Sequence, residues 1–175
     1  MTTGGRAALT TDEFDPFVAG LDYPMFVVTT ATDGGATRAG CMVGFTTQAS
    51  IDPPRFLVCL SVKNRTYRVA KDATTLAVHV LDSDDHPLAE LFGGTTGDEV
   101  DKFARCRWTP GPDGVPLLDG CPRRLVGRVL ATHDLGDHVG FLLEPFEVHA
   151  DPPESTHEEE LTFQRVKDVD AGHPA

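Results

Sequence analysis

Short runs of apolar and β-branched residues, separated by turn-forming residues, recur along most of the chain. The run Pro24–Thr30 is followed by Asp33-Gly34-Gly35, and this combination predicts a strand that enters a hairpin. In the run Thr75–Leu81 apolar and β-branched residues outnumber polar ones, which predicts a buried strand. Pro145, inside the last long run, predicts an edge position or a break in that strand. The predicted strands cover residues 24–30, 36–45, 56–62, 75–81, 124–133 and 139–150.

Helical segments are shorter than the strands and interrupt them irregularly. Asn64 predicts the capped start of a helix over residues 65–72, and Ser83 predicts the start of another over residues 87–92. Two more short helices are predicted at residues 12–19 and 99–104. Because five or six strands occur without a βαβ alternation, we expect a mainly β fold: a closed, Greek-key-like antiparallel barrel with a few short helices.

Length and charge describe one acidic domain. The chain has 175 residues, enough for a single core, and a formal net charge of −12, which argues against nucleic acid binding. We expect an N-terminal extension over residues 1–22, the folded domain over residues 23–150, and an acidic surface tail over residues 151–175. Leu161, Phe163 and Val166 in that tail could still dock on the body or on a second subunit. With no run of ~20 apolar residues and no signal-like N-terminus, we expect a cytoplasmic protein without membrane contact.

Few motifs of common enzymes occur in the sequence. No serine lies in GxSxG, and the sequence has no GxxxxGK[ST] phosphate loop, no GxGxxG after a strand and no HExxH. The segment from His133 to His138 carries His and Asp residues, but its glycine marks a hairpin turn, so we expect no metal there. His79, in the middle of a buried strand, is expected to be a core histidine. Such a chain fits chemistry supplied by a bound cofactor.

Four short motifs follow one another along residues 23–148. The longest is Gly40–Pro54, in which a glycine and a Thr-rich stretch precede Ser-Ile-Asp-Pro-Pro. The others are Lys63-Asn64-Arg65-Thr66-Tyr67, then Leu88-Ala89 to Phe92-Gly93 with Asp101-Lys102-Phe103 and Trp108, and Gly136-Asp137-His138. In this order they resemble the flavin reductase-like family, whose fold is the FMN-binding split barrel. Where many members carry Thr-Val-Ser-Ser, this chain has Met42-Val43-Gly44-Phe45, without two hydroxyls that often face the isoalloxazine ring.

The resemblance implies where a flavin would bind. Its ring would lie against the strand that starts at Met42, where Gly44 permits close approach of the backbone. Its phosphate would lie at the basic cluster of Lys63, Arg65, Arg68 and Lys71, which could otherwise be a solvated helix face. His138, oriented by Asp137, would lie beside the reduced nicotinamide and is the implied catalytic residue. The implied cofactor-binding residues are Met42, Val43, Gly44, Phe45, Thr46, Thr47, Ser50, Ser61, Lys63, Asn64, Arg65, Thr66, Phe92 and Asp137.

The function implied by the resemblance is an NAD(P)H:flavin reductase that transfers hydride to FMN or FAD. A homodimer would complete the flavin site, and a monooxygenase could consume the reduced flavin. Arg123 and Arg124 could contact the 2′-phosphate of NADPH or form a solvated pair. Three alternatives stay open: a split-barrel enzyme that uses a deazaflavin donor or an organic substrate, a non-catalytic flavin- or haem-binding carrier, and a dimeric scaffold without cofactor affinity.

Overall fold

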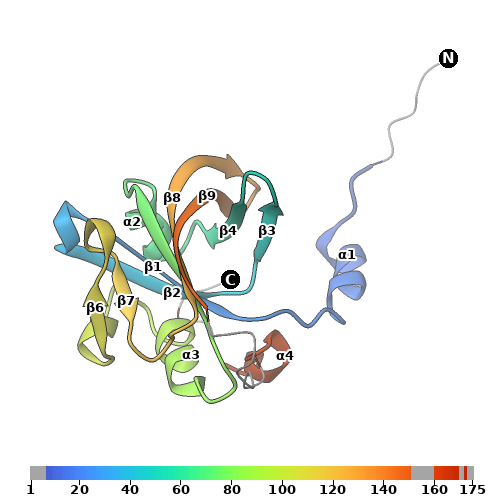
Figure 1. Ribbon diagram of the computed structural model, residues 1–175. Helices are drawn as coiled ribbons and strands as arrows, with labels where there is room; N and C mark the ends of the chain where they lie inside the picture. The colour runs from blue at the N-terminus through green and yellow to red at the C-terminus, as the bar shows by residue number, and fades with distance from the viewer. Residues whose placement is uncertain (1–6, 151–159, 170–171, 173–175) are drawn as a thin grey trace.

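One antiparallel sheet of seven strands dominates the computed structural model, which describes residues 7–150, 160–169 and 172. The strand order is β2-β1-β5-β8-β9-β4-β3, and a separate two-stranded ribbon pairs β6 with β7 (Figure 1). The strands are β1 (Phe26–Thr32), β2 (Thr37–Val43), β3 (Thr46–Ser50), β4 (Arg55–Ser61), β5 (Thr75–Val80), β6 (Trp108–Pro110), β7 (Pro116–Leu118), β8 (Arg124–Asp134) and β9 (His138–His149).

The two edge strands of this sheet, β2 and β3, are consecutive in the chain. Only Gly44 and Phe45 separate them, and the carbonyl of Phe45 accepts a hydrogen bond from the amide of Cys59 on β4 (2.9 Å). The chain therefore passes directly from one edge of the sheet to the other, and the sheet curls into a barrel. The mainly β, split-barrel prediction is confirmed.

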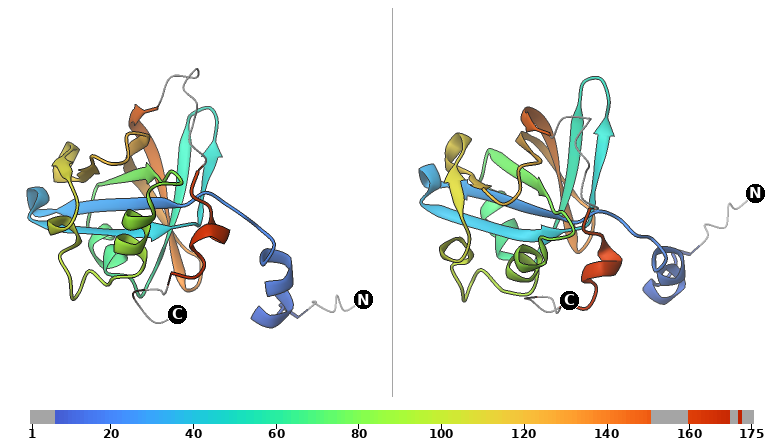
Figure 2. Two further views of the ribbon diagram at one scale, coloured as in Figure 1. Left: turned by 90° about the horizontal axis from the view of Figure 1, so that it is seen from below. Right: turned by 60° about the horizontal axis from the view of Figure 1, so that its bottom comes forward.

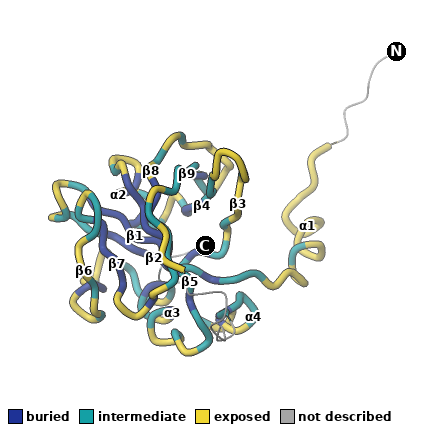
Figure 3. Tube along the Cα trace, viewed as in Figure 1, coloured by how far each residue is buried: buried dark blue, intermediate teal, exposed yellow. Residues whose placement is uncertain are grey.

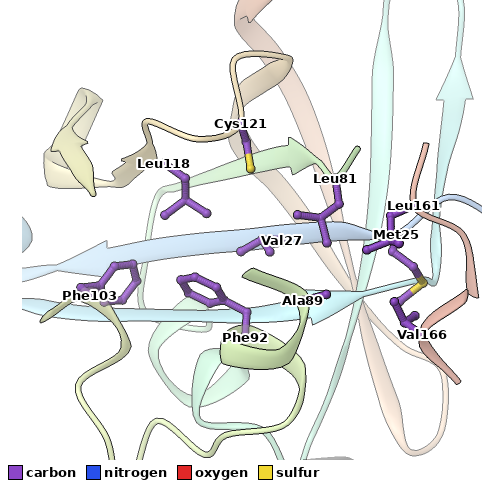
Figure 4. Packing of buried hydrophobic residues seen from close by; sticks show 10 residues of the cluster. All are labelled: Met25, Val27, Leu81, Ala89, Phe92, Phe103, Leu118, Cys121, Leu161 and Val166. Atoms are coloured by element: carbon purple, nitrogen blue, oxygen red, sulfur yellow. The ribbon is translucent and has the colours of Figure 1, made fainter. Parts of the chain in front are cut away.

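Two apolar clusters cover the two faces of β1. Because neighbouring side chains of a strand point to opposite faces, Val28 belongs to the cluster inside the barrel, whereas Val27 belongs to a cluster outside it. The outer cluster packs α3 and the C-terminal segment against the sheet (Figure 4). Both faces are thus covered, and residues 27–31 are all buried (Figure 3).

The helices are short. They are α1 (Thr11–Val18), α2 (Arg65–Ala70), α3 (His86–Gly93) and α4 (Phe163–Val166), with 3-10 turns at Asp33–Gly35, Lys102–Ala104 and Pro112–Gly114. Asn64 caps α2 as predicted, since its side chain accepts from the amide of Thr66 at 3.0 Å. The cap predicted at Ser83 is wrong, because α3 begins after Asp85. None of the helices in the part of the chain described is long and apolar enough to cross a membrane.

Pro145 causes the break that the sequence predicts. Val126 of β8 pairs with Glu147, and the next residue, Gly127, pairs with Pro145, so Phe146 forms a bulge in β9. The pairing of β9 with β4 ends at Leu143, which leaves Pro145 without a neighbouring strand on that side.

Part of the C-terminal segment returns to the body. Leu161 is fully buried, its amide donates to the carbonyl of Leu81, and its carbonyl accepts from the amide of Met25. Val166 is also buried in the outer cluster. The residues that the sequence left open for docking thus pack on the body, while the glutamates at positions 154, 158 and 159 lie outside the described residues.

His79 of β5 is a core histidine, as expected. Its Nδ1 donates to the carbonyl of Val27 (3.0 Å), and its Nε2 accepts from the amide of Leu118 (3.1 Å). Burial lowers the pKa of His79 to about 4, so the ring is neutral and links β1, β5 and β7.

Candidate active site

A cavity of about 320 Å³ lies where β1 begins, β2 and β4 end and β9 begins. The pairing of Ser61 with His138 joins the ends of β4 and β9, and the amide of Val62 donates to the carbonyl of Asp137 (3.0 Å). Nine of the fifteen predicted site residues line this cavity: Met42, Val43, Gly44, Phe45, Ser61, Lys63, Asn64, Asp137 and His138.

A row of aromatic rings forms part of the cavity wall. The ring of Phe45 lies 5.1 Å from that of His138 and 6.0 Å from that of Tyr23, centroid to centroid. Tyr23 in turn stacks on Phe163 of α4 at 5.1 Å and an interplanar angle of 20°. These four residues, which we call the aromatic row, come from four separate parts of the chain. A planar ligand can stack on such rings.

The aromatic row explains the glycine in Met42-Val43-Gly44-Phe45. A Cβ added at Gly44 would lie 2.3 Å from Cε2 of Tyr23 and 3.2 Å from Sδ of Met25. The space that a serine would fill at position 44 is therefore occupied by Tyr23. At position 44 the cavity wall therefore carries the ring of Tyr23 in place of a side chain of its own.

His138 and Asp137 form a hydrogen-bonded pair at the mouth of the cavity. Nδ1 of His138 lies 2.8 Å from Oδ1 of Asp137, and this bond holds the pKa of the Asp137 carboxyl below its usual range. The side chain of His138 is 26% exposed, whereas that of Asp137 is 86% exposed. Asp137 therefore orients the imidazole from the solvent side, and the imidazole faces Phe45.

The basic cluster divides into two parts. Lys63 and Asn64 line the cavity, whereas Arg65 and Thr66 line a neighbouring cavity of about 350 Å³ together with Arg38. Arg68 is paired with Asp98, and this pair holds the pKa of Asp98 below its usual value. Arg65 also lies near Asp98, at 3.8 Å. Of the basic residues in the cluster, Lys63 is the one that lines the main cavity.

Four predicted residues lie outside both cavities. Thr46, Thr47 and Ser50 lie along β3, and Thr47 is exposed to solvent. Phe92 is 1% exposed and packs behind β2, where a Cβ added at Gly40 would lie 2.8 Å from its ring. Phe92 supports the strand from the core.

Sequence reasoning missed several residues of the site. Tyr23, Met25, Cys41, Cys59, Leu60 and Phe163 also line the cavity. Lys102, one of the few buried charged residues, donates from Nζ to the carbonyls of Gly40 (3.2 Å) and Phe92 (3.0 Å), and burial lowers its pKa. The motif Asp101-Lys102-Phe103 is the signal that could have identified this lysine as a support of β2.

No group of three or more His, Cys, Asp or Glu side chains in residues 7–150 and 160–169 is arranged to hold a metal ion. His133 and His138 lie at the ends of paired strands around the β8–β9 turn. All four cysteines are free thiols.

Residues 18–170 match the model of the flavin reductase-like domain. The chain belongs to this family. A relative named FMN reductase (NADH) RutF, from Enterobacter cloacae, is 35% identical over 107 residues, which are 61% of this chain and 65% of the relative. The chain thus spans slightly less than two thirds of the length of that protein.

Solved structures agree with this flavin reductase-like fold. The NADH:FAD oxidoreductase SgcE6 of Streptomyces globisporus superimposes with a TM-score of 0.73 at 24% identity, over 85% of this chain and 89% of that chain. A nitrilotriacetate monooxygenase component B homologue from Mycobacterium thermoresistibile gives 0.72 at 21% identity, over 86% and 84%. These likenesses establish the split-barrel fold.

Proposed function

We propose that this protein is a flavin reductase that transfers hydride from a reduced nicotinamide to FMN or FAD. The observation that carries the proposal is the single cavity that joins the aromatic row, the Asp137–His138 pair and Lys63. An apolar slot with a few polar groups at its edge suits a flat, polar-edged tricycle.

The residues that line the cavity fit a flavin in their chemistry. Met42, Val43 and Leu60 provide apolar contact, and the aromatic row provides rings on which the flavin can stack. Lys63 supplies positive charge where the cavity reaches the start of α2, and Asn64 lies beside it. Because Asn64 already caps the six-residue helix, the phosphate would depend on cationic side chains more than on free backbone amides.

Bound flavin supplies the chemistry, accepting hydride at its N5 atom. The chain holds the two rings in contact and excludes water from them. His138 packs against Phe45 at the edge of the cavity, a position from which it can hold a nicotinamide over the flavin. The hydride step needs no protein general base, which agrees with the absence of the hydrolytic motifs from the sequence.

The choice of cofactors is part of the proposal. The relative named FMN reductase (NADH) favours NADH as donor and FMN as acceptor. The neighbouring cavity lined by Arg38 and Arg65 offers room for the adenylate part of FAD. Arg123 and Arg124 line a different groove, and Arg123 is paired with Asp82 and Glu160, so neither supports recognition of an NADPH 2′-phosphate at this cavity.

The proposed enzyme acts as a homodimer and releases reduced flavin to a monooxygenase. Released reduced flavin reacts with oxygen, so a consuming enzyme is the partner class that its chemistry requires. A non-catalytic flavin carrier is the second candidate. In a reductase that uses a deazaflavin donor, the deazaflavin would bind in the same cavity.

A spectrum of the purified protein followed by an NADH assay tests the proposal. We expect bound or added FMN or FAD to show quenched flavin fluorescence, and NADH oxidation to depend on added flavin. Flavin binding without NAD(P)H oxidation would favour the carrier. A protein that binds neither flavin would overturn the proposal. Replacing His138 with Ala is expected to lower kcat/KM for NADH at least tenfold while leaving flavin affinity within about threefold.

A further inference from the structure

Helix α1 exposes an apolar face that its own chain does not cover. Phe14 and Phe17 are 49% and 73% exposed, and their rings stack at 6.0 Å. With Val18 they have the i, i+3, i+4 spacing that places residues on one side of a helix. α1 stands away from the barrel at the end of an extended segment (Figures 1 and 2). Isolated helices of this length are unstable in water, so α1 needs a surface to pack on.

An apolar groove lies at the end of the barrel where β1 and β8 begin and β9 ends. Its volume is about 600 Å³, and its apolar lining includes Phe26, Phe56, Phe146 and Val148. We call it the barrel-end groove. Phe146 and Val148 are 47% and 63% exposed, because β9 has no partner strand on its β4 side beyond Leu143. The groove is thus lined by apolar side chains at the ends of strands whose other residues pack in the core.

The groove and the helix carry complementary charge. Arg124 lines the groove, and in the described part of the chain its side chain makes no hydrogen bond or ion pair; its Nε is buried without a partner. The neighbouring Arg123 is paired with Asp82 and Glu160. On α1, Glu13 is used by the capping box with Thr10, whereas the carboxylate of Asp15 beside the apolar stripe has no partner among the described residues.

We propose that α1 of one copy docks in the barrel-end groove of a second copy, with Phe14 and Phe17 on its apolar lining and Asp15 facing Arg124. In a twofold dimer each copy donates one helix and accepts one, so both exposed surfaces of the chain are covered at once. A second copy is the occupant that fits because both surfaces belong to this chain, are apolar and carry opposite charges in Asp15 and Arg124. The inference rests on the proposed homodimer and does not depend on flavin chemistry.

Photo-crosslinking in a mixture of two isotopic forms tests the contact directly. Benzoylphenylalanine replaces Phe17 in the unlabelled chain, which is mixed and re-equilibrated with ¹⁵N-labelled chain and then irradiated. We expect peptides in which unlabelled α1 is joined to labelled β8 or β9. Cross-links only within one chain, or only to other faces of the barrel, would overturn the proposal, as would a wild-type protein that is monomeric at all concentrations tested.

Charge reversal provides the matched control in the same protein. Asp15→Arg and Arg124→Asp are each expected to raise the dimer dissociation constant about fivefold, and the double variant is expected to recover most of that loss. Asp12→Arg makes the same charge change on the opposite side of α1 and should leave the constant unchanged. The double variant Phe14→Ser/Phe17→Ser should raise it at least about tenfold. Analytical ultracentrifugation measures all of these; equal effects of Asp12→Arg and Asp15→Arg, or no recovery in the double variant, would refute the pairing.

Discussion

The space beside Gly44 belongs to the ring of Tyr23. A Cβ at this position would lie within 3.0 Å of two ring carbons of Tyr23, so the glycine is required by a side-chain contact rather than by an unusual backbone conformation. This contact couples Tyr23, which precedes β1, to the end of β2 that faces the proposed flavin. The motif therefore has no hydroxyl side chain at position 44 because Tyr23 of the aromatic row fills that space.

A double-mutant cycle at Gly44 and Tyr23 tests this coupling. Gly44→Ser is expected to lower the free energy of unfolding by about 1–3 kcal/mol and to weaken flavin binding, because the new side chain displaces Tyr23. In a Tyr23→Ala background the same change should cost much less, since the ring that it meets is gone. Urea unfolding and flavin fluorescence titration measure the two effects. If the two substitutions act additively, the contact does not explain the glycine.

His79 gives the fold a pH dependence of known sign. Its pKa is about 4 in the folded protein against 6.5 ordinarily, so the unfolded chain binds the proton more readily. The contribution is fully present above pH 6.5 and is lost as the pH falls through that value towards 4, which amounts to about 3 kcal/mol in total. Between pH 7.5 and 5.0 we expect the wild type to lose about 2 kcal/mol more than His79→Gln in urea unfolding. Parallel losses in both proteins would contradict this assignment.

Site residues that sequence reasoning could predict are those within local motifs. Lys63, Asn64 and His138 each sit in a short segment whose order resembles the family, and each lines the cavity. Tyr23 and Phe163 belong to no such segment, and they meet only because the C-terminal segment returns to the start of β1. Phe92 shows the converse, since a residue inside a family motif serves the core. The sequence does not show which distant parts of the chain come into contact, and the positions of Tyr23 and Phe163 depend on such a contact.

At the scale of elements, the C-terminal segment supports both the core and the site. Leu161 bridges Leu81 and Met25 through backbone hydrogen bonds, while two residues later Phe163 reaches the cavity and stacks on Tyr23. Glu160 adds an ion pair with Arg123 at 2.9 Å. The acidic tail expected from residue 151 onward thus contains a short element that holds the aromatic row in place.

Two substitutions in this element should separate its two roles. Leu161→Ala removes a fully buried side chain and is expected to lower the free energy of unfolding by about 2–4 kcal/mol, with little change in flavin affinity at low temperature. Phe163→Ala removes a half-buried ring from the cavity wall and should weaken flavin binding several-fold at a smaller cost in stability. Calorimetry and fluorescence titration compare them. Equal effects of both variants on affinity would mean that Phe163 acts only through the fold.

Local patterns predicted six strands and the three helices α1, α2 and α3, but missed the short strands β3, β6 and β7 and the four-residue helix α4. Each predicted run forms a strand within two residues of its predicted bounds, and the run 36–45 ends at Val43, where the chain crosses to the other sheet edge. Helix starts depend on one capping residue, and several polar residues precede α3. Asp82, Ser83, Asp84 and Asp85 all offer a cap by sequence, and α3 starts after Asp85.

For the whole molecule, the barrel joins parts that no local pattern connects. The short link through Gly44 and Phe45 closes the sheet, and Phe45 is also one ring of the aromatic row. The same two residues therefore contribute to the barrel and to the site. The pattern of strands without a βαβ alternation predicts a closed antiparallel barrel, and the family resemblance specifies the split barrel.

Binding of flavin should therefore stabilise the whole barrel. A ligand that binds only the folded state adds about 2.7 kcal/mol when its free concentration is a hundred times its dissociation constant. For a chain of this length we expect the melting temperature to rise by roughly 5–10 °C with saturating FMN or FAD.

Lys63→Ala is expected to reduce the shift at a fixed flavin concentration and to make the remaining shift less dependent on salt, because a charge contact to phosphate is lost. Lys71→Ala, a cation outside both cavities, is the matched control. Differential scanning calorimetry at two salt concentrations decides the matter: equal shifts in wild type and Lys63→Ala would show that the phosphate lies elsewhere, and no shift in wild type would show that the barrel does not bind the flavin.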